Sequence, residues 1–176
     1  MSIAVTTQQL PLDPERQKLM DEVMAHLDPD RLRDLLVRLV DIHSPTGDER
    51  AASEFIAEHL VDEVGIDARY QPITEDTGNA YGEITGTGDG ARLLLYAPID
   101  THLEPEIDRA TLGRRIREDM LPAARVDGDL VFGLGASNPK CMVAGLTEVV
   151  HAVKDSGIPL LGDLAVGFAG GGMPWS

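Results

Sequence analysis

The chain has 176 residues and a mass of 19.0 kDa, which is enough for one large domain that folds without disulfide bonds. Its 30 acidic and 15 basic side chains give a formal net charge of −15, which repels phosphate backbones and anionic bilayers and argues against nucleic-acid and membrane partners. The longest apolar runs are far shorter than the roughly 20 residues of a membrane span, and Cys141 is the single cysteine, so we expect a cytoplasmic protein without internal disulfides.

Three helices are predicted in the first third of the chain. Asp13-Pro14 and Asp28-Pro29 each place an N-cap residue directly before a proline, a pattern that starts a helix. Apolar residues then recur at helical spacing in the second of these segments, and again over 48–65, where a glycine supplies the stop signal. These last two segments are therefore expected to be amphipathic helices with one covered face, and the first is expected to be a helix over about 14–27.

The rest of the chain alternates between strand and helix signals. Strands are predicted over 66–73, 80–85, 92–99 and 163–168, and a helix over 140–155. A short hairpin around an Asp-Gly turn is expected over 126–132. The charged stretch 104–124 is interpreted as a solvated excursion that includes at most a short helix.

These elements predict an α/β fold. Residues 92–99 form a continuous apolar run without alternation, which is typical of a strand covered on both faces in a parallel sheet. We therefore expect a three-layer sandwich with a mixed, mainly parallel sheet and helices on its two sides. Residues 1–12 are interpreted as a loose N-terminal arm, and residues 13–176 as one domain.

Ligands bind such sheets at the carboxyl ends of the strands. This rule directs attention to the loops that follow Ile99, Phe132 and Phe168. The second of these loops is rich in glycine and leads into the predicted helix at Lys140.

Segments at and around these loops resemble one known family. They are Ser44–Glu49, Asn79–Gly82, Leu95–Thr101, Gly133–Lys140 and Gly157–Phe168. Together they are similar to the co-catalytic zinc amidohydrolases that include acetylornithine deacetylase, succinyl-diaminopimelate desuccinylase, aminoacylase and carboxypeptidase G. The resemblance implies hydrolysis of an amide or N-acyl amino acid with zinc or another divalent metal. Members of that family are about twice as long, so it also implies an incomplete catalytic domain without the lid domain.

The metal ligands that the resemblance implies are mostly replaced. Pro98 stands where the family has a zinc-ligand histidine, and Asn138 stands where it has the aspartate that bridges both metals. The glutamate pair that supplies the base and a further ligand aligns with Gly172 and Met173, which offer no carboxylate. Only Asp100, which orients the histidine in the family, is kept. The chain alone therefore lacks the anionic ligands and the base of the family's route.

The residues also allow other chemistry. Asp100 and His102 lie at alternating strand positions, so both could hold a single metal ion, although such a pair often has a structural or solvated role. Cys141 lies in the first turn of a predicted helix, where a thiol is activated as a nucleophile, but a cysteine there is also commonly a small packing residue.

Two glycine-rich loops are candidate ligand-binding segments. In the first, Gly135, Ser137 and Asn138 precede a helix start where backbone N–H groups can hold an anion, and Lys140 is expected there as a structural partner of Asp100 or Asp163. In the second, Gly171 and Gly172 form either a backbone nest for a ligand or the point where the fold is interrupted.

Three functions are consistent with these patterns. The first is a divergent amide hydrolase whose site and sheet are completed by a second polypeptide or a second copy. The second is a catalytically inactive subunit that binds a small amide or amino-acid-like ligand or has a structural role. The third is a truncated product without a function of its own.

Overall fold

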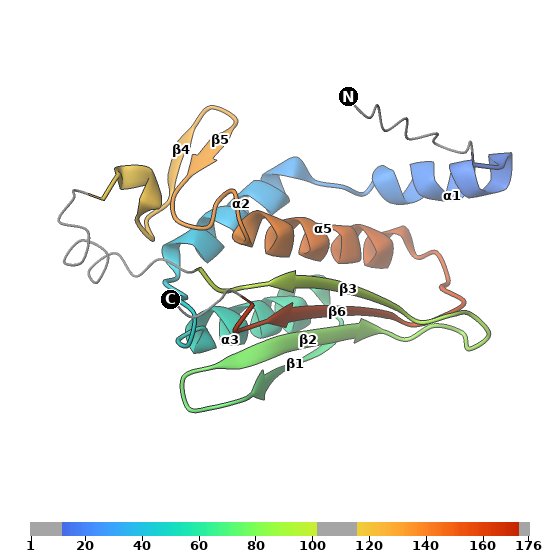
Figure 1. Cartoon of the computed structure of the whole chain (residues 1–176). Helices are drawn as coiled ribbons and strands as arrows, with labels where there is room; N and C mark the ends of the chain where they lie inside the picture. Colours follow the sequence, from blue (N-terminus) through green and yellow to red (C-terminus); the bar gives the residue numbers. More distant parts are fainter. Residues whose placement is uncertain (1–11, 102–115, 173–176) are drawn as a thin grey trace, which may run out of the picture.

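The computed structural model describes residues 12–101 and 116–172 and confirms the α/β class (Figure 1). The N-terminal part contains α1 (Pro14–Met24), α2 (Pro29–Asp41), α3 (Arg50–His59), the π-helical turn η1 (Leu60–Val64), β1 (Asp67–Pro72), β2 (Gly78–Ile84) and β3 (Leu93–Pro98). The C-terminal part contains the 3-10 turn η2 (Glu118–Met120), the hairpin strands β4 (Arg125–Asp127) and β5 (Leu130–Phe132), α5 (Lys140–Ser156) and β6 (Leu164–Ala169). Residues 1–11 of the expected arm and residues 104–115 of the charged excursion lie outside the described residues.

The two aspartates predicted to start helices do so. The Asp13 carboxylate accepts a hydrogen bond from the Arg16 N–H at 3.0 Å. The Asp28 carboxylate accepts the N–H groups of Asp30 and Arg31, which lowers the pKa of Asp28 below its ordinary value. Caps rather than buried side chains define the first helix, because no residue of α1 is buried.

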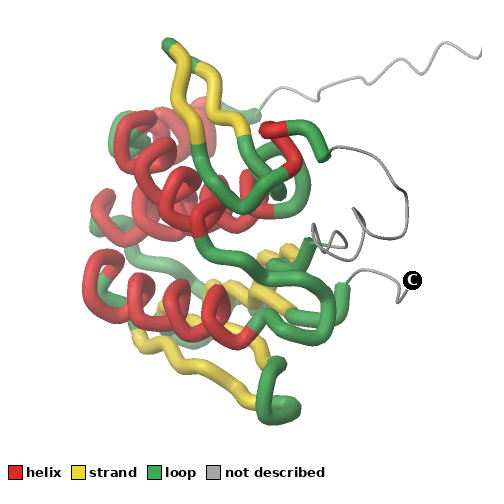
Figure 2. The backbone as a smooth tube through the Cα atoms, turned by 90° about the vertical axis from the view of Figure 1, so that its left-hand side faces the viewer, coloured by secondary structure: helices red, strands yellow, loops and turns green. Residues whose placement is uncertain are grey.

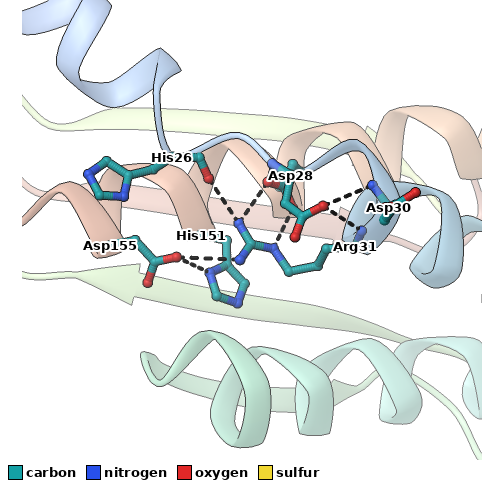
Figure 3. A network of polar contacts seen from close by, with 7 residues as sticks. His26, Asp28, Asp30, Arg31, His151 and Asp155 are labelled. Carbon is teal, nitrogen blue, oxygen red and sulfur yellow. Dashed lines mark hydrogen bonds and ion pairs between the residues drawn. The ribbon is translucent and has the colours of Figure 1, made fainter.

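A charge pair between the half-buried Arg31 of α2 and a buried glutamate of α5 joins the two helices (Figure 3 shows Arg31). The guanidinium of Arg31 donates from Nε and Nη2 to the two oxygens of Glu148, at 2.8 and 2.7 Å. Glu148 is only 3% exposed, and its Oε1 also accepts the Asp28 N–H at 2.7 Å. Arg31 reaches further to the carbonyl of His26 and to Asp155. The start of α2 is therefore held by a bidentate, charge-assisted contact.

The four-stranded sheet has the order β1-β2-β6-β3. β1 and β6 each pair antiparallel with β2, and only β3 and β6 pair parallel. The sheet is mixed, as predicted, but the expected parallel majority is wrong. A short turn at 73–77 joins β1 to β2 and allows only antiparallel pairing, whereas the long crossover through α5 makes β3 and β6 parallel.

The helices that contact the sheet lie on one of its faces (Figure 2). α3 packs on β1 and β2, α5 packs on β3 and β6, and α2 packs on α5. They share one core with the inward side chains of the strands, among them Ala80, Ala97, Val166 and Phe168. None of the helices in the described ranges has the length and apolar character needed to cross a bilayer.

The opposite face of the sheet is open over β3. Leu94 and Tyr96 point to that face and are 57% and 56% exposed. The prediction that both faces of this strand are covered is therefore wrong for the described part of the chain. The apolar residues of this run belong to two different faces of the sheet. Leu95 and Ala97 face the helices, whereas Leu94 and Tyr96 face outward.

Candidate functional site

The parallel pair β3 and β6 brings its two following loops together at one end of the sheet (Figure 1). Asp100 and Thr101 follow β3, and the glycine segment Gly170–Gly172 follows β6. The loop Gly133–Asn138, which leads into α5, lies close to Thr101, since Thr101 and Gly135 line the same cavity. This is the edge that the position of the loops in the sequence predicted.

Three buried or half-buried side chains clamp the glycine segment. The successive N–H groups of Gly170–Gly172 donate, in order, to Asn79 Oδ1 (3.2 Å), Glu49 Oε1 (2.8 Å) and Asp100 Oδ1 (3.0 Å). The second oxygen of Asp100 accepts the Thr46 hydroxyl at 2.8 Å. Glu49 and Asp100 are both 0% exposed. We call this group, Thr46, Glu49, Asn79, Asp100 and Gly170–Gly172, the clamp.

The clamp uses the N–H groups that were predicted as a ligand nest. Those of Gly171 and Gly172 already have acceptors within the chain. A side chain at position 172 has no room, because its Cβ would lie 2.5 Å from Cβ of Pro98 and 3.1 Å from Asp100 Oδ1. Pro98, Asp100 and Gly172, the positions singled out by the resemblance, are thus neighbours in space.

The Gly133–Asn138 loop encloses an open cavity of about 370 Å³. Gly133 and Gly135 have backbone φ angles of +142° and +87°, which residues other than glycine rarely adopt. The cavity is lined by Thr101, Met120, Phe132, Gly135, Ser137 and Asn138, among others. Ser137 and Asn138 are exposed, so their hydroxyl and amide groups face the solvent. The structure therefore brings Gly135, Ser137 and Asn138 together beside a cavity.

Lys140 lies below this loop and is 1% exposed. Its aliphatic chain fills the space beside Gly135, where an added Cβ would lie 2.9 Å from Lys140 Cδ, and its ammonium group donates to the carbonyl of Ile42. Burial lowers the pKa of Lys140 to about 8, although the charge of Asp41 opposes the shift. The predicted partner Asp163 pairs with Arg92 instead, at 2.7 Å. Lys140 therefore supports the loop from below, through its packing beside Gly135 and its hydrogen bond to Ile42.

Cys141 is placed in the first turn of α5, as predicted. Its thiol is half-buried and donates to the carbonyl of Ser137 at 2.9 Å. The contact joins the helix start to the loop that lines the cavity. This geometry fits the packing interpretation of Cys141 and leaves the nucleophile interpretation as a prediction.

The residues present do not fit the two-metal site that the resemblance implies. The described part of the chain contains no group of three or more His, Cys, Asp or Glu side chains arranged to hold a metal ion. Pro98 has no donor atom, and Asn138 offers a neutral amide where two dications would need an anionic bridge. His102, proposed with Asp100 as a metal ligand, and Met173 lie outside the described residues. No hydrolytic step through a metal follows from these side chains.

Sequence reasoning named Asp100 but missed its partners in the clamp. Thr46 and Glu49 lie in the segment Ser44–Glu49, and Asn79 begins the segment Asn79–Gly82. Both segments belong to the resemblance, yet nothing in their spacing shows that they meet the end of β6. The sequence did contain a signal for these partners, because Thr46, Glu49 and Asn79 are polar residues in segments of the resemblance and had no assigned role.

Comparison with known proteins gives the fold. No protein-family model matches the chain. Among solved structures, it is similar to a tripeptidase from Staphylococcus aureus, with 20% identity, a TM-score of 0.60, and coverage of 83% of this chain and 37% of the tripeptidase. It is also similar to the dipeptidase Dug1p from Saccharomyces cerevisiae, with 18% identity, a TM-score of 0.63, and coverage of 88% and 34%.

Human carnosine dipeptidase 1 shows the same likeness, with 15% identity, a TM-score of 0.61, and coverage of 90% of this chain and 35% of the dipeptidase. The chain therefore has an α/β fold like that of part of these peptidase structures. The chain spans about a third of the length of these three structures. At these identities the likeness establishes the fold.

Proposed function

We propose that this chain is a divergent protein on an amide-hydrolase scaffold that binds a small amide or amino-acid-like molecule in the cavity beside Gly133–Asn138. The observation that carries the proposal is the placement of Gly135, Ser137 and Asn138, which line one open cavity at the carboxyl end of the sheet. A hydroxyl and a carboxamide supply both donors and acceptors. This chemistry suits the carbonyl and N–H groups of an amide.

The surroundings of the cavity favour a ligand with a carboxylate and an apolar group. A larger open depression of about 780 Å³ shares Asp119 and Phe132 with the cavity and is also lined by Arg117 and Arg125. The Arg125 guanidinium lies 4.1 Å from the ring centroid of Phe132. Arg117 already donates to both oxygens of Asp119, so an amino-acid-like molecule would place its carboxylate near Arg125 and its side chain on the ring.

Binding without turnover is the form of this proposal that the described side chains support. Glu49 and Asp100 are buried and accept backbone N–H groups in the clamp. Asp119, a carboxylate that lines the cavity, accepts hydrogen bonds from Arg117. These three carboxylates are therefore already engaged within the chain. A second candidate, hydrolysis of the bound amide, is favoured by the likeness to tripeptidases and dipeptidases. It requires ligands or a base from outside the described residues or from another chain.

The test is a titration of the protein with N-acetyl amino acids and dipeptides, followed by backbone amide NMR shifts. We expect saturable shifts at Gly135, Ser137 and Asn138, and a loss of affinity of about fivefold or more in Asn138→Ala, as expected when one ligand hydrogen bond is removed. Asp89→Ala, an exposed substitution in the turn at the other end of the sheet, is the matched control.

Turnover separates the two candidates. Incubation of the same compounds with the protein, with and without added zinc, is followed by mass spectrometry of the products. Intact ligand after saturable binding supports the binding protein, and zinc-dependent cleavage supports the hydrolase. Shifts scattered over the whole surface, or none at any concentration, would contradict both.

A further inference from the structure

One histidine, His59, is buried among charged groups far along α3 from the clamp. It ends α3 at the point where the α-helix passes into the π-helical turn η1, and it is 4% exposed. Its Nδ1 lies 3.2 Å from Oε1 of Glu63, yet it has no hydrogen-bond partner among the described residues. A neutral imidazole tolerates this setting at lower cost than an imidazolium, which must place a proton on both ring nitrogens.

The carboxylate beside His59 is already used by another cation. Arg38 of α2 donates from Nη1 to the same Oε1 of Glu63 at 2.8 Å. The guanidinium carbon of Arg38 also lies 4.7 Å from the ring centroid of Phe55, which holds it in place. The ring centroids of Phe55 and His59 are 6.2 Å apart. A protonated His59 would therefore have to share one carboxylate with a fixed arginine.

α5 contributes a second histidine to this region. The charge of His151 acts on His59 across the packing of α5 on η1. Nδ1 of His151 lies 3.1 Å from Oδ2 of Asp155, and Nη1 of Arg31 approaches the same oxygen at 3.4 Å (Figure 3). The helix interface thus contains the same arrangement twice, in which one carboxylate oxygen serves both an arginine and a histidine.

These surroundings oppose a proton on His59. Burial lowers the pKa of His59 below its ordinary value of 6.5, the charges of Arg38 and His151 act in the same direction, and Glu63 opposes them. The ionisable side chains of β1, the strand that packs on η1, are exposed: they are Asp67 and Arg69. If η1 separates from its neighbours, His59 meets water and binds a proton more readily. Separation of η1 is therefore coupled to proton uptake.

We propose that Arg38, His59, Glu63 and His151 form an acid-sensitive latch, which holds η1 against α2 and α5 while His59 is neutral and releases η1 when His59 is protonated. The release is local, because η1 is a five-residue turn whose contact with Arg38 lies at the surface. Because one proton is taken up, the equilibrium constant for opening rises by up to about tenfold for each pH unit below the ordinary pKa of histidine.

The latch is independent of the proposed ligand cavity. His59 ends α3, whereas Glu49, the clamp residue, precedes the first turn of the same helix. Opening of η1 is therefore expected to leave the clamp and the Gly133–Asn138 loop in place. The inference can fail or succeed whatever the outcome of the ligand titrations.

Hydrogen exchange followed by NMR tests the latch in the full chain without ligand. Protection factors, which correct for the intrinsic effect of pH on exchange, are compared between about pH 7 and pH 5. We expect protection of the η1 amides to fall by about fivefold or more, while that of β6 changes by less than about twofold. His59→Gln should abolish the fall at η1, because the side chain no longer titrates. His26→Gln, at an exposed histidine, is the matched control and should retain it.

Titration of the His59 ring by NMR tests the charge balance directly. We expect a midpoint below 6.5 in the unmodified chain, because burial and the two neighbouring cations disfavour the imidazolium. Glu63→Gln should lower the midpoint further, since it removes the one anion that favours the protonated ring. This direction is specific to the proposed contact.

Three outcomes would overturn the proposal. They are an equal loss of protection at η1 and β6, a loss at η1 that His59→Gln retains, and a midpoint of His59 at or above 6.5. Circular dichroism at about pH 7 confirms the fold of each variant. Should His59→Gln not fold, His59→Leu replaces it, because an apolar side chain fills the buried position without a group that titrates.

Discussion

The two glycine-rich loops at the carboxyl end of the sheet differ in the direction of their polar groups. The clamp around Gly170–Gly172 turns its polar groups inward, and Glu49 and Asp100 hold consecutive N–H groups in complete burial. The Gly133–Asn138 loop turns Ser137 and Asn138 outward to a cavity and is supported from below by Lys140. Although both loops are rich in glycine, one binds its N–H groups to buried side chains of the chain and the other presents exposed side chains beside an open cavity.

The difference teaches which polar groups are available for chemistry. A carboxylate that already accepts two hydrogen bonds in a buried setting stabilises the fold, and its removal exposes unsatisfied donors. A hydroxyl or amide at a cavity wall contributes little to folding and is free to meet a ligand. The predictions below separate these roles by comparing stability with binding.

The largest expected effect is the loss of a clamp carboxylate. Asp100→Ala removes the acceptor for the Thr46 hydroxyl and for the Gly172 N–H in a fully buried position. We expect the free energy of unfolding to fall by about 3 kcal/mol, because hydrogen bonds to charged groups contribute about 1.5–3 kcal/mol each. Urea unfolding measures the change, and exposed Asp48→Ala, expected within about 0.5 kcal/mol, is the control. Equal effects of the two substitutions would refute the clamp.

The second effect is a pH dependence that comes from Lys140. Its pKa is lowered from 10.5 to about 8 in the folded state, so the unfolded chain binds more protons between these values. Stability therefore rises with pH in this window, by about 2 kcal/mol between roughly pH 7.5 and 9.5. Lys140→Met should lack this rise when both proteins are unfolded by urea across the same range. A parallel rise in both would assign the dependence to another group.

The third effect tests the tight approach below the cavity loop. Gly135→Ala places a Cβ 2.9 Å from Lys140 Cδ and 3.1 Å from Thr101 Cγ2, at a φ of +87°. We expect a loss of about 1–3 kcal/mol in unfolding free energy. Gly145→Ala is the control, since nothing lies within 4 Å of its added Cβ inside α5, and it should stabilise by about 0.5–1 kcal/mol. Thermal unfolding of both variants reports the sign directly.

The smallest effect on stability is expected on the cavity wall. Ser137→Ala removes an exposed hydroxyl and should change the unfolding free energy by less than about 0.5 kcal/mol. The same substitution should weaken binding of the amide ligand several-fold in the titration described above. A variant that is destabilised yet binds normally would place Ser137 with the clamp rather than with the cavity.

Local signals in the sequence were enough for the elements of the fold. Asp13 and Asp28 cap helices as their spacing before proline predicted, and the glycine at 65 ends η1 with a φ of +74°. The hairpin around the Asp-Gly turn is also present as β4 and β5. Each of these depends on a few neighbouring residues, so a short window of sequence determines it.

Contacts between distant segments were beyond the same reasoning. The clamp joins Glu49 to Gly171 across 122 positions, and no periodicity records such a meeting. The apolar run of β3 was misread for a related reason. Composition shows that a strand is apolar on both faces, but it does not show whether a helix of the same chain covers each face. None of the described helices covers the face that carries Leu94 and Tyr96.

The Arg31–Glu148 contact also decides how much of the N-terminal region the domain needs. None of the α1 side chains is buried, whereas Asp28 and Arg31 are tied to a glutamate that is 3% exposed. A protease acting on the native protein should therefore trim the chain as far as the connection after Met24 and stop short of Asp28. Mass spectrometry of such a digest should find a resistant product starting in this connection, with an unfolding midpoint close to that of the intact chain.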